Sequence, residues 1–307
     1  VEEKATGEIL VGAGVGSDGG TAAFSVSENN FLGKGVKLST GLRVSEERIR
    51  GNFTVTNPNF NYSDKALSTD IFITDTDKLT DFGYKSTDAG FSIGTAFEQY
   101  DDFYFRPTFR TSYEQLTTNS DASANLKKQE GTYFTTNIGY VLDLDKRNQR
   151  FQTSSGYRSR FNQSIPLISE DTAFFNSYEF TTFNQISDMV TRLSIQGSAI
   201  NAIGDEDVRI SKRLYIPSKK LRGFESGKIG PKDSGDYIGG NYTAVLNAST
   251  TLPEFGANLE TIDFQIFFDA ANVWGVDYDS SLDNSHLRSS VGLSIDSVSY
   301  THLTLPT

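Results

Sequence analysis

Ser285 and His286 are residue types that a hydrolase could use as a nucleophile and its base. Such catalysis also needs a third group that orients the histidine, and donors that stabilise the oxyanion. Neither is evident beside a turn of this kind, and the other histidine, His302, belongs to the last few residues of the chain. We therefore interpret His286 as a turn residue, and we expect no enzyme activity.

Two other patterns suggest a ligand at first sight. Asp75 and Asp77 have the alternate spacing of a calcium loop, but the glycine and the distal glutamate of an EF-hand are missing. We interpret both as solvated charges of a loop. The glycines at 12, 14 and 16 could be mistaken for a phosphate-binding loop, but no helix pattern follows them. We expect no metal and no cofactor, and we interpret these glycines as part of a weakly packed strand.

Arg222 is the residue best placed for a specific polar contact. It lies in a long segment between strands that we expect to end near Ile203 and to begin near Ile238, and Gly223 beside it tolerates positive φ. The charges of this segment would be stable outside in water. Alternatively, the segment folds inward and Arg222 meets a partly desolvated carboxylate, which favours a bidentate guanidinium. The residues alone leave both interpretations open.

A period of two residues governs the elements that would position such a contact. Ile262, Phe264, Ile266 and Phe268 alternate with a second row that contains Asp263, Gln265 and Asp269. This alternation is typical of a strand with one apolar and one polar face, so Asp269 is expected on the polar face. Similar alternation occurs within residues 36–45, 48–55, 103–114 and 134–142.

The number and length of the strands predict the fold class. About fourteen candidate strands are separated by turns such as Asn57-Pro58-Asn59 and Gly204-Asp205, and helical periodicity is almost absent. Many strands match the ~9–11 residues that cross a membrane at a tilt, whereas soluble strands average ~5–6. A soluble sandwich would give similar alternation, but strand length favours an all-β, transmembrane antiparallel β-barrel. Aromatic residues that we place near strand ends support the membrane: Tyr100, Tyr104, Tyr140 and Trp274.

Composition excludes several other classes. The formal net charge of −11 and a pI near 4.7 argue against nucleic acid as a partner. The absence of cysteine excludes disulfides and thiolate metal sites. No stretch approaches the ~20 consecutive apolar residues that a membrane helix needs.

Four segments, in family order, resemble the barrel domain of the BamA/TamA superfamily of outer-membrane assembly and translocation proteins. Residues 6–35 (TGEILVGAGVGSDGGTAAFSVSENNFLGKG) resemble its first hairpin. Residues 145–157 (DKRNQRFQTSSGY) resemble the start of a later strand, although Gln152 stands where proline is usual. Residues 212–241 contain a sequence like the family's Val-Arg-Gly-Phe/Tyr loop tip, and residues 267–274 (FFDAANVW) resemble a strand near the end.

The resemblance implies about fourteen of sixteen family strands, with the long loop folded into the lumen. It implies that Arg222 pairs with Asp269, and parity places Ser249 where relatives often carry a second carboxylate. The implied loop tip is Leu221, Arg222, Gly223 and Phe224. The implied soft seam, where incoming strands pair, is formed by Gly7, Glu8, Ile9, Leu10, Val11 and Gly12.

The departures from the family concern the two ends of the chain. We expect residues 1–6 to be the end of a linker from periplasmic POTRA domains, and residues 7–296 to be a barrel that lacks its last two strands. The ending SVSYTHLTLPT, residues 297–307, resembles neither missing strand, and we interpret it as a non-native tail.

The implied function is the folding and insertion of β-barrel proteins into a bacterial outer membrane, without bond chemistry. The implied partners are unfolded outer-membrane β-barrel proteins, outer-membrane lipid, and accessory lipoproteins that bind through POTRA domains. Two alternatives remain. One is a translocation pore of the two-partner secretion or TamA-like kind, and the other is a passive porin.

Overall fold

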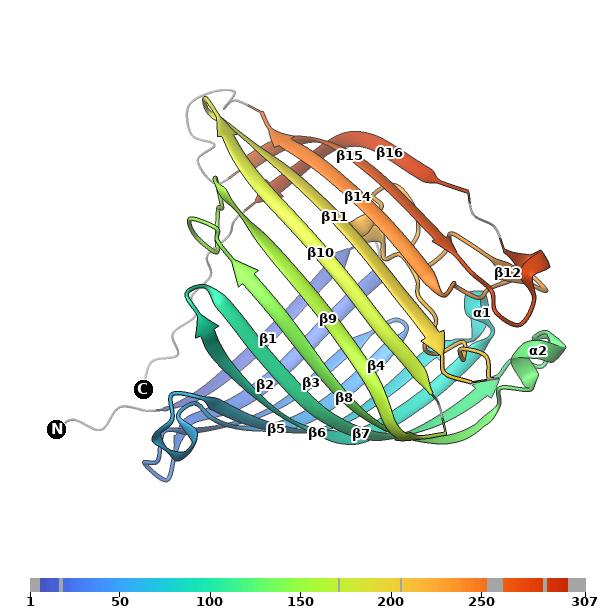
Figure 1. Ribbon diagram of the computed structural model, residues 1–307, viewed down its shortest axis with the longest axis horizontal. Helices are drawn as coiled ribbons and strands as arrows, with labels where there is room; N and C mark the ends of the chain where they lie inside the picture. Colours follow the sequence, from blue (N-terminus) through green and yellow to red (C-terminus); the bar gives the residue numbers. More distant parts are fainter. Residues whose placement is uncertain are drawn as a thin grey trace.

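A computed structural model describes residues 6–16, 19–170, 172–204, 206–252, 262–283 and 286–297. Fourteen strands form one antiparallel sheet, which curls around a central space (Figure 1). The all-β architecture that the alternation predicts is confirmed. The strands are β1 (Gly7–Gly16), β2 (Gly19–Phe31), β3 (Val36–Ser45), β4 (Arg48–Asn57), β5 (Ala66–Lys78), β6 (Tyr84–Tyr100), β7 (Phe103–Thr118), β8 (Gly131–Asp145), β9 (Gly156–Ser169), β10 (Ala173–Ile186), β11 (Met189–Ala202), β14 (Tyr242–Thr251), β15 (Ile262–Trp274) and β16 (Arg288–Ser297).

Each strand of this sheet pairs with its neighbour in the chain, except that β14 follows β11 across a long loop. We call the end of the sheet at which β1 begins its N-terminal end (Figure 1). The short helices α1 (Leu79–Phe82) and α2 (Ala124–Lys127) lie at the opposite end. Among the described residues, no helix is long and apolar enough to cross a membrane.

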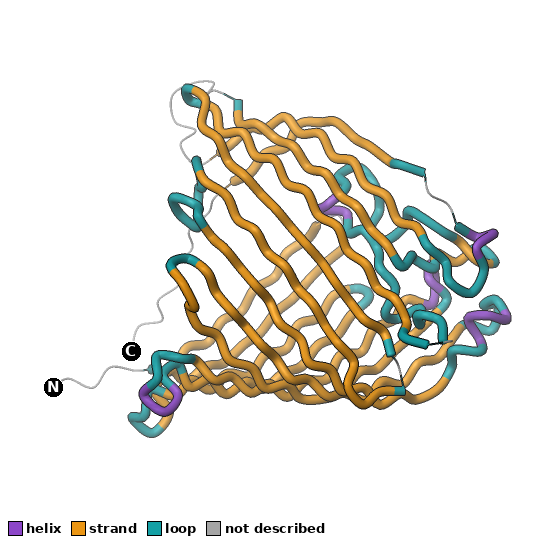
Figure 2. Tube along the Cα trace, viewed as in Figure 1, coloured by secondary structure: helices purple, strands orange, loops and turns teal. Residues whose placement is uncertain are grey.

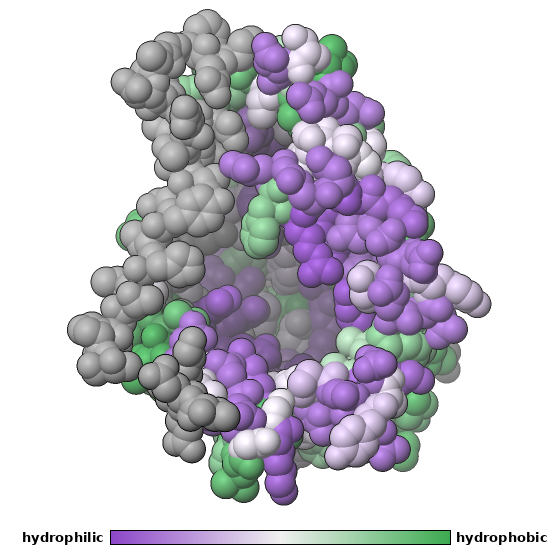
Figure 3. Space-filling model, turned by 90° about the vertical axis from the view of Figure 1, so that its left-hand side faces the viewer, coloured by the Kyte–Doolittle hydropathy of each residue, from purple (hydrophilic) through white to green (hydrophobic). Residues whose placement is uncertain are grey.

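The two faces of the sheet differ as the alternation predicts. On the outer face, cross-strand neighbours are apolar, for example Phe109, Ile138 and Ile165 on β7, β8 and β9. One residue further along, Arg110 and Asn137 pair on the inner face. Seen from the left-hand side of Figure 1, the molecule has a hollow lined largely by hydrophilic residues (Figure 3). The outer face therefore suits lipid, and the inner face suits water.

The two edge strands of the sheet are β1 and β16, and no ladder joins them within the described part of the chain. Both carry exposed apolar side chains on the outer face. Val11 and Val15 of β1 are 78% and 92% exposed, and Val291 and Leu293 of β16 are each 74% exposed. An edge of this kind presents unpaired backbone groups beside an apolar surface.

The main hydrophobic core lies in the loops near α1 and α2, at the end opposite the N-terminal end of the sheet. It joins Phe82 of α1, Leu126 of α2, and Ile210 and Ile238 from the loop that follows β11. Ile238 is fully buried there and belongs to the loop. The strand expected to begin near Ile238 is β14, which begins later, at Tyr242. This loop also contains η2 (Ser218–Lys220) and a small hairpin of β12 (Lys232–Asp233) and β13 (Asp236–Tyr237).

Three of the four aromatic residues expected near strand ends lie there. Tyr100 ends β6, Tyr104 is the second residue of β7, and Trp274 ends β15. Tyr140 is different, because it lies within β8 and donates a hydrogen bond to Gln163 Oε1 at 2.7 Å. Its position was wrongly predicted, since the alternation gives a residue's face but not its height along the strand.

Candidate functional site

The long loop enters the lumen and places Arg222 on Asp269. Arg222 Nε donates to Asp269 Oδ2 and its terminal Nη2 donates to Oδ1, each at 2.7 Å. The backbone N–H of Arg222 also donates to Oδ2, at 3.1 Å. Asp269 is fully buried, while the Arg222 side chain is 30% exposed. This is the two-pronged geometry in which a guanidinium holds a carboxylate most strongly.

The neighbour of Asp269 on the preceding strand is Asn247, which lies directly opposite it in the ladder between β14 and β15. Asn247 Nδ2 lies 2.8 Å from Asp269 Oδ1 and 2.8 Å from the carbonyl oxygen of Lys220. The expectation for Ser249 was wrong, because Ser249 pairs with Phe267, two residues away along the same face. Asn247 therefore supplies an amide that binds both the wall carboxylate and the loop backbone.

The backbone conformation of Gly223 and the ring of Phe267 also help to position Arg222. Gly223 has φ of +86°, a left-handed conformation that glycine adopts without strain. The guanidinium carbon of Arg222 lies 3.7 Å from the centre of the Phe267 ring. Phe267 faces the lumen beside Gly292 of β16, where an added Cβ would come within 2.8 Å of the ring. The ring therefore needs a glycine on the neighbouring strand.

The rest of the loop tip packs on the apolar part of the lumen wall. Leu221 is 1% exposed and joins a buried cluster with Val245 of β14 and Val273 of β15. Phe224 packs against the same cluster and stays partly exposed. Leu221 and Phe224 thus lie against the wall on either side of Arg222 and Gly223, and η2 lies inside the curled sheet (Figure 2).

A second anchor, which the sequence analysis missed, joins the loop to the opposite part of the wall. Glu114 of β7 is 3% exposed, and its Oε2 lies 3.4 Å from Arg209 and 3.3 Å from Lys212. Arg209 is itself buried and lies over the ring of Tyr133, 3.7 Å from its centre. Two carboxylates on different strands, Glu114 and Asp269, therefore hold three cations of one loop.

Arg213 adds a third tie, to the loop that follows β15. Its guanidinium contacts Asp277, which also accepts hydrogen bonds from the backbone N–H of Val208 at 2.7 Å and from Asn241 at 3.0 Å. Burial alone would favour the neutral acid. The charge of Arg213 and these hydrogen bonds outweigh that cost, so the pKa of Asp277 lies below its ordinary value.

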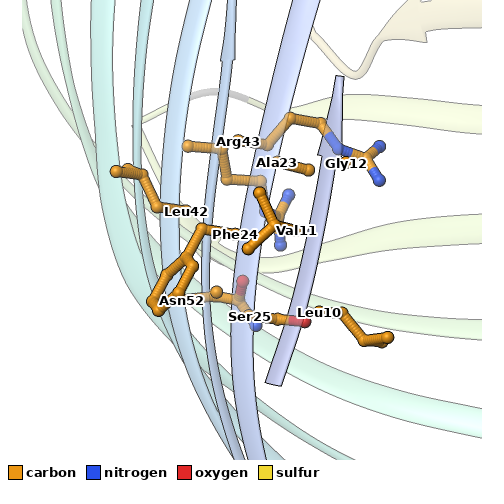
Figure 4. Close-up of a pocket in the computed structure, with 11 residues that line it drawn as sticks. Leu10, Val11, Gly12, Ala23, Phe24, Ser25, Leu42, Arg43 and Asn52 are labelled. Carbon is orange, nitrogen blue, oxygen red and sulfur yellow. The ribbon is translucent and has the colours of Figure 1, made fainter. Parts of the chain in front are cut away.

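The predicted seam residues all lie on β1, the first strand of the sheet. The registers place Ile9 and Val11 on the outer face, with Glu8, Leu10 and Gly12 toward the lumen. In Figure 4, Phe24 and Leu42 project to one side of the sheet and Leu10 and Arg43 to the other. An added Cβ at Gly12 would meet no atom within 4 Å, so the lumen side of β1 is open at this point.

Hydrogen bonding shows which residues of β1 face the free edge. The N–H of Asn29 donates to the carbonyl oxygen of Thr6 at 3.0 Å, so the backbone of Thr6 faces β2. Backbone groups alternate in direction along an antiparallel strand, and the β1–β2 register is continuous. The even-numbered residues therefore bond to β2. The N–H and C=O groups that face the free edge, and that no ladder to a described residue pairs, belong to Gly7, Ile9, Val11, Ala13 and Val15.

The rejected ligand patterns have structural counterparts. Asp75 and Asp77 lie on β5 rather than in a loop, and Lys85 Nζ lies 3.2 and 3.9 Å from their carboxylates. Expecting them in a loop was wrong, because the strand runs on to Lys78. Gly12 and Gly14 lie within β1. His286 lies before β16, and Ser285 lies outside the described residues.

The fold and this loop together define a class of protein, the β-barrels of outer membranes that hold a loop in their lumen. The comparison with family models is specific: residues 30–299 match the Omp85 superfamily domain. The match covers most of the chain, and the chain belongs to the Omp85 superfamily. Assembly factors of this superfamily are not enzymes, which confirms the expectation that the chain carries out no bond chemistry.

Relatives at low identity fall into two groups. The chain is 26% identical over 304 residues to the outer membrane protein assembly factor BamA of Neorickettsia risticii, covering 95% of this chain and 40% of that protein. It is 23% identical over 295 residues to the sorting and assembly machinery component 50 homolog of Bos taurus, covering 89% of this chain and 60% of that protein. The chain thus spans about half the length of these relatives.

Solved structures support the fold alone. A crystal structure of BamA from Haemophilus ducreyi, lacking POTRA domains 1–3, superposes with a TM-score of 0.86 at 19% identity, covering 96% of this chain and 64% of that one. CdiB from Acinetobacter baumannii superposes less well, with a TM-score of 0.53 at 12% identity, covering 94% of this chain and 52% of that one.

Proposed function

We propose that the chain folds and inserts β-barrel proteins in a bacterial outer membrane, with the free edge of β1 as the template for an incoming strand. The observation that carries this proposal is the row of unpaired backbone groups from Gly7 to Val15, next to exposed apolar side chains. In hydrocarbon each unpaired group costs several kcal/mol. A client strand that pairs there removes this cost by β-augmentation.

The names of the relatives support the same function, because both groups are assembly components. The proposed partners are unfolded β-barrel proteins, outer-membrane lipid and, through POTRA domains outside this sequence, accessory lipoproteins. A passive porin fits less well, because the lumen holds a loop that is tied to the wall at Glu114 and Asp269. A secretion or TamA-like pore remains the alternative that an insertion assay separates.

A proline scan of β1 in the full-length protein tests this proposal. Val11→Pro removes an N–H that faces the free edge and leaves the pairing of β1 with β2 intact. Insertion of an unfolded β-barrel client into proteoliposomes, followed by its heat-modifiable band, should slow at least about tenfold, since a hydrogen bond in hydrocarbon is lost. The protein's own heat-modifiable band should be unchanged.

Neighbouring positions are the controls. Gly12→Ala adds a Cβ into open space and should insert clients at the original rate. Leu10→Pro removes an N–H that faces β2 and should weaken the β1–β2 hairpin itself. Normal insertion by Val11→Pro would contradict the proposal. Solute flux without any client insertion would instead favour a pore.

A further inference from the structure

A small cavity of 180 Å³ lies on the lumen wall near the N-terminal end of the sheet. Arg158 stands near the start of β9 and Arg192 near the start of β11, and both strands begin at that end. The charged and aromatic lining of the cavity consists of Arg147, Arg158, Arg160, Arg192, Glu179 and Phe183.

Part of this arginine cluster is held by Asp143 of β8. Asp143 is 1% exposed and its Oδ2 lies 2.7 Å from Arg106, 2.7 Å from Arg158 and 3.0 Å from Arg160. A second carboxylate, Asp145, binds Arg147 through two guanidinium nitrogens, each at 2.7 Å. The wall thus already pairs guanidinium groups with carboxylates in several geometries.

Cations nevertheless outnumber anions here. Five arginines and Lys220, which binds Glu179 at 3.3 Å, face only three carboxylates, in a chain whose net charge is −11. Arg192 is exposed and has no ion pair with any described residue, and its guanidinium carbon lies 5.9 Å from the centre of the Phe183 ring. The Nε of Arg160 is buried and has no hydrogen-bond partner among the described residues. Donors and positive charge therefore remain for a ligand.

We propose that this cavity binds carboxylate side chains of an extended acidic polypeptide segment. A free guanidinium takes a carboxylate through two parallel hydrogen bonds, as Arg222 does on Asp269. The cavity is small and lies on the polar inner face of the sheet, which suits side chains of an unfolded chain better than a folded domain. That the segment belongs to a client rests on the proposed function; the binding itself does not.

The test uses the full-length protein in neutral detergent micelles and a fluorescent hexaglutamate peptide, followed by anisotropy at low ionic strength. Arg192→Gln should weaken peptide binding about tenfold, because among the described arginines that line the cavity Arg192 alone has no carboxylate partner. Arg43→Gln is the matched control. Arg43 is an exposed lumen-facing arginine of β3, away from the cavity, and its loss changes the net charge equally. It should change affinity less than twofold.

Three outcomes would overturn the proposal: no peptide binding, equal weakening by Arg192→Gln and Arg43→Gln, or displacement by inorganic phosphate beyond that of chloride at matched ionic strength. The last would mark a phosphate site. The edge variant Val11→Pro should bind the peptide normally. Loss of insertion with intact peptide binding, or the reverse, therefore separates failure of the proposed function from failure of this site.

Discussion

Replacing Asp269 by alanine should free the loop tip from the lumen wall. The change leaves the Arg222 guanidinium partly desolvated without its carboxylate, and removing one member of a buried pair typically costs about 3–5 kcal/mol. Arg222→Ala should cost a similar amount, because it abandons a fully buried carboxylate. The double variant should cost less than the sum, since each single change already destroys the pair.

Chymotrypsin cleavage near Phe224, measured in the full-length protein, reports on this release without depending on basic residues. If opening is fast relative to cleavage, a loss of about 3–5 kcal/mol raises the cleavage rate roughly 10²–10⁴-fold. Lys219→Ala is the control, because Lys219 is an exposed cation of the same loop. Strictly additive effects of the two single variants would return Arg222 to the role of an ordinary loop residue.

Replacing Glu114 by glutamine should release the part of the loop around Arg209 and leave the tip around Arg222 bound to Asp269. Glutamine keeps the shape of the side chain but removes the charge that faces Arg209 and Lys212. Because Arg209 stays buried over Tyr133, the expected cost is about 3 kcal/mol. Hydrogen exchange of the backbone around Arg209 should rise, while exchange around Arg222 stays unchanged.

A matched comparison separates anchoring from general destabilisation. Lys212→Gln removes the more exposed of the two cations, at 28% side-chain exposure, and should have a much smaller effect. Combining Glu114→Gln with Asp269→Ala should give nearly additive losses, because the two carboxylates share no partner. If Glu114→Gln loosened both halves of the loop equally, the idea of two separate anchors would be wrong.

The position of Asp269 could be predicted because parity is a local property. Alternation from Ile262 to Asp269 indicates which residues share a face, and the resemblance to the family's loop motif identified Arg222 as part of the loop tip. The amide of Asn247 could not be predicted in the same way. Its place opposite Asp269 depends on the register of two strands, and the sequence of either strand does not specify that register.

Contacts between distant segments set the limit of the sequence analysis. The alternation within residues 103–114 includes Glu114, but its partner Arg209 comes from a loop far along the chain. Arg158 and Arg192 likewise meet at one cavity only because β9, β10 and β11 lie side by side. The residues of β1 whose N–H groups face the free edge could be identified only from the hydrogen bond between Asn29 and Thr6. Alternation of side chains does not show which way the backbone groups point.

The most direct measurement of the central claim is a disulfide between β1 and a client strand caught during insertion. The 307 residues contain no cysteine, so Leu10→Cys is the one thiol that they contribute to the full-length protein. Because the backbone of Leu10 faces β2, a client strand would place its residue at a close, non-hydrogen-bonded position suited to a disulfide. Client cysteines at every second position should cross-link, with a maximum at one register.

Ile71→Cys, on the doubly paired strand β5, is the control, because Ile71 is as exposed as Leu10 (58% against 56%) and should not cross-link. A client that inserts at full rate without cross-linking to Leu10→Cys, or that cross-links equally to Ile71→Cys, would contradict templating by the β1 edge.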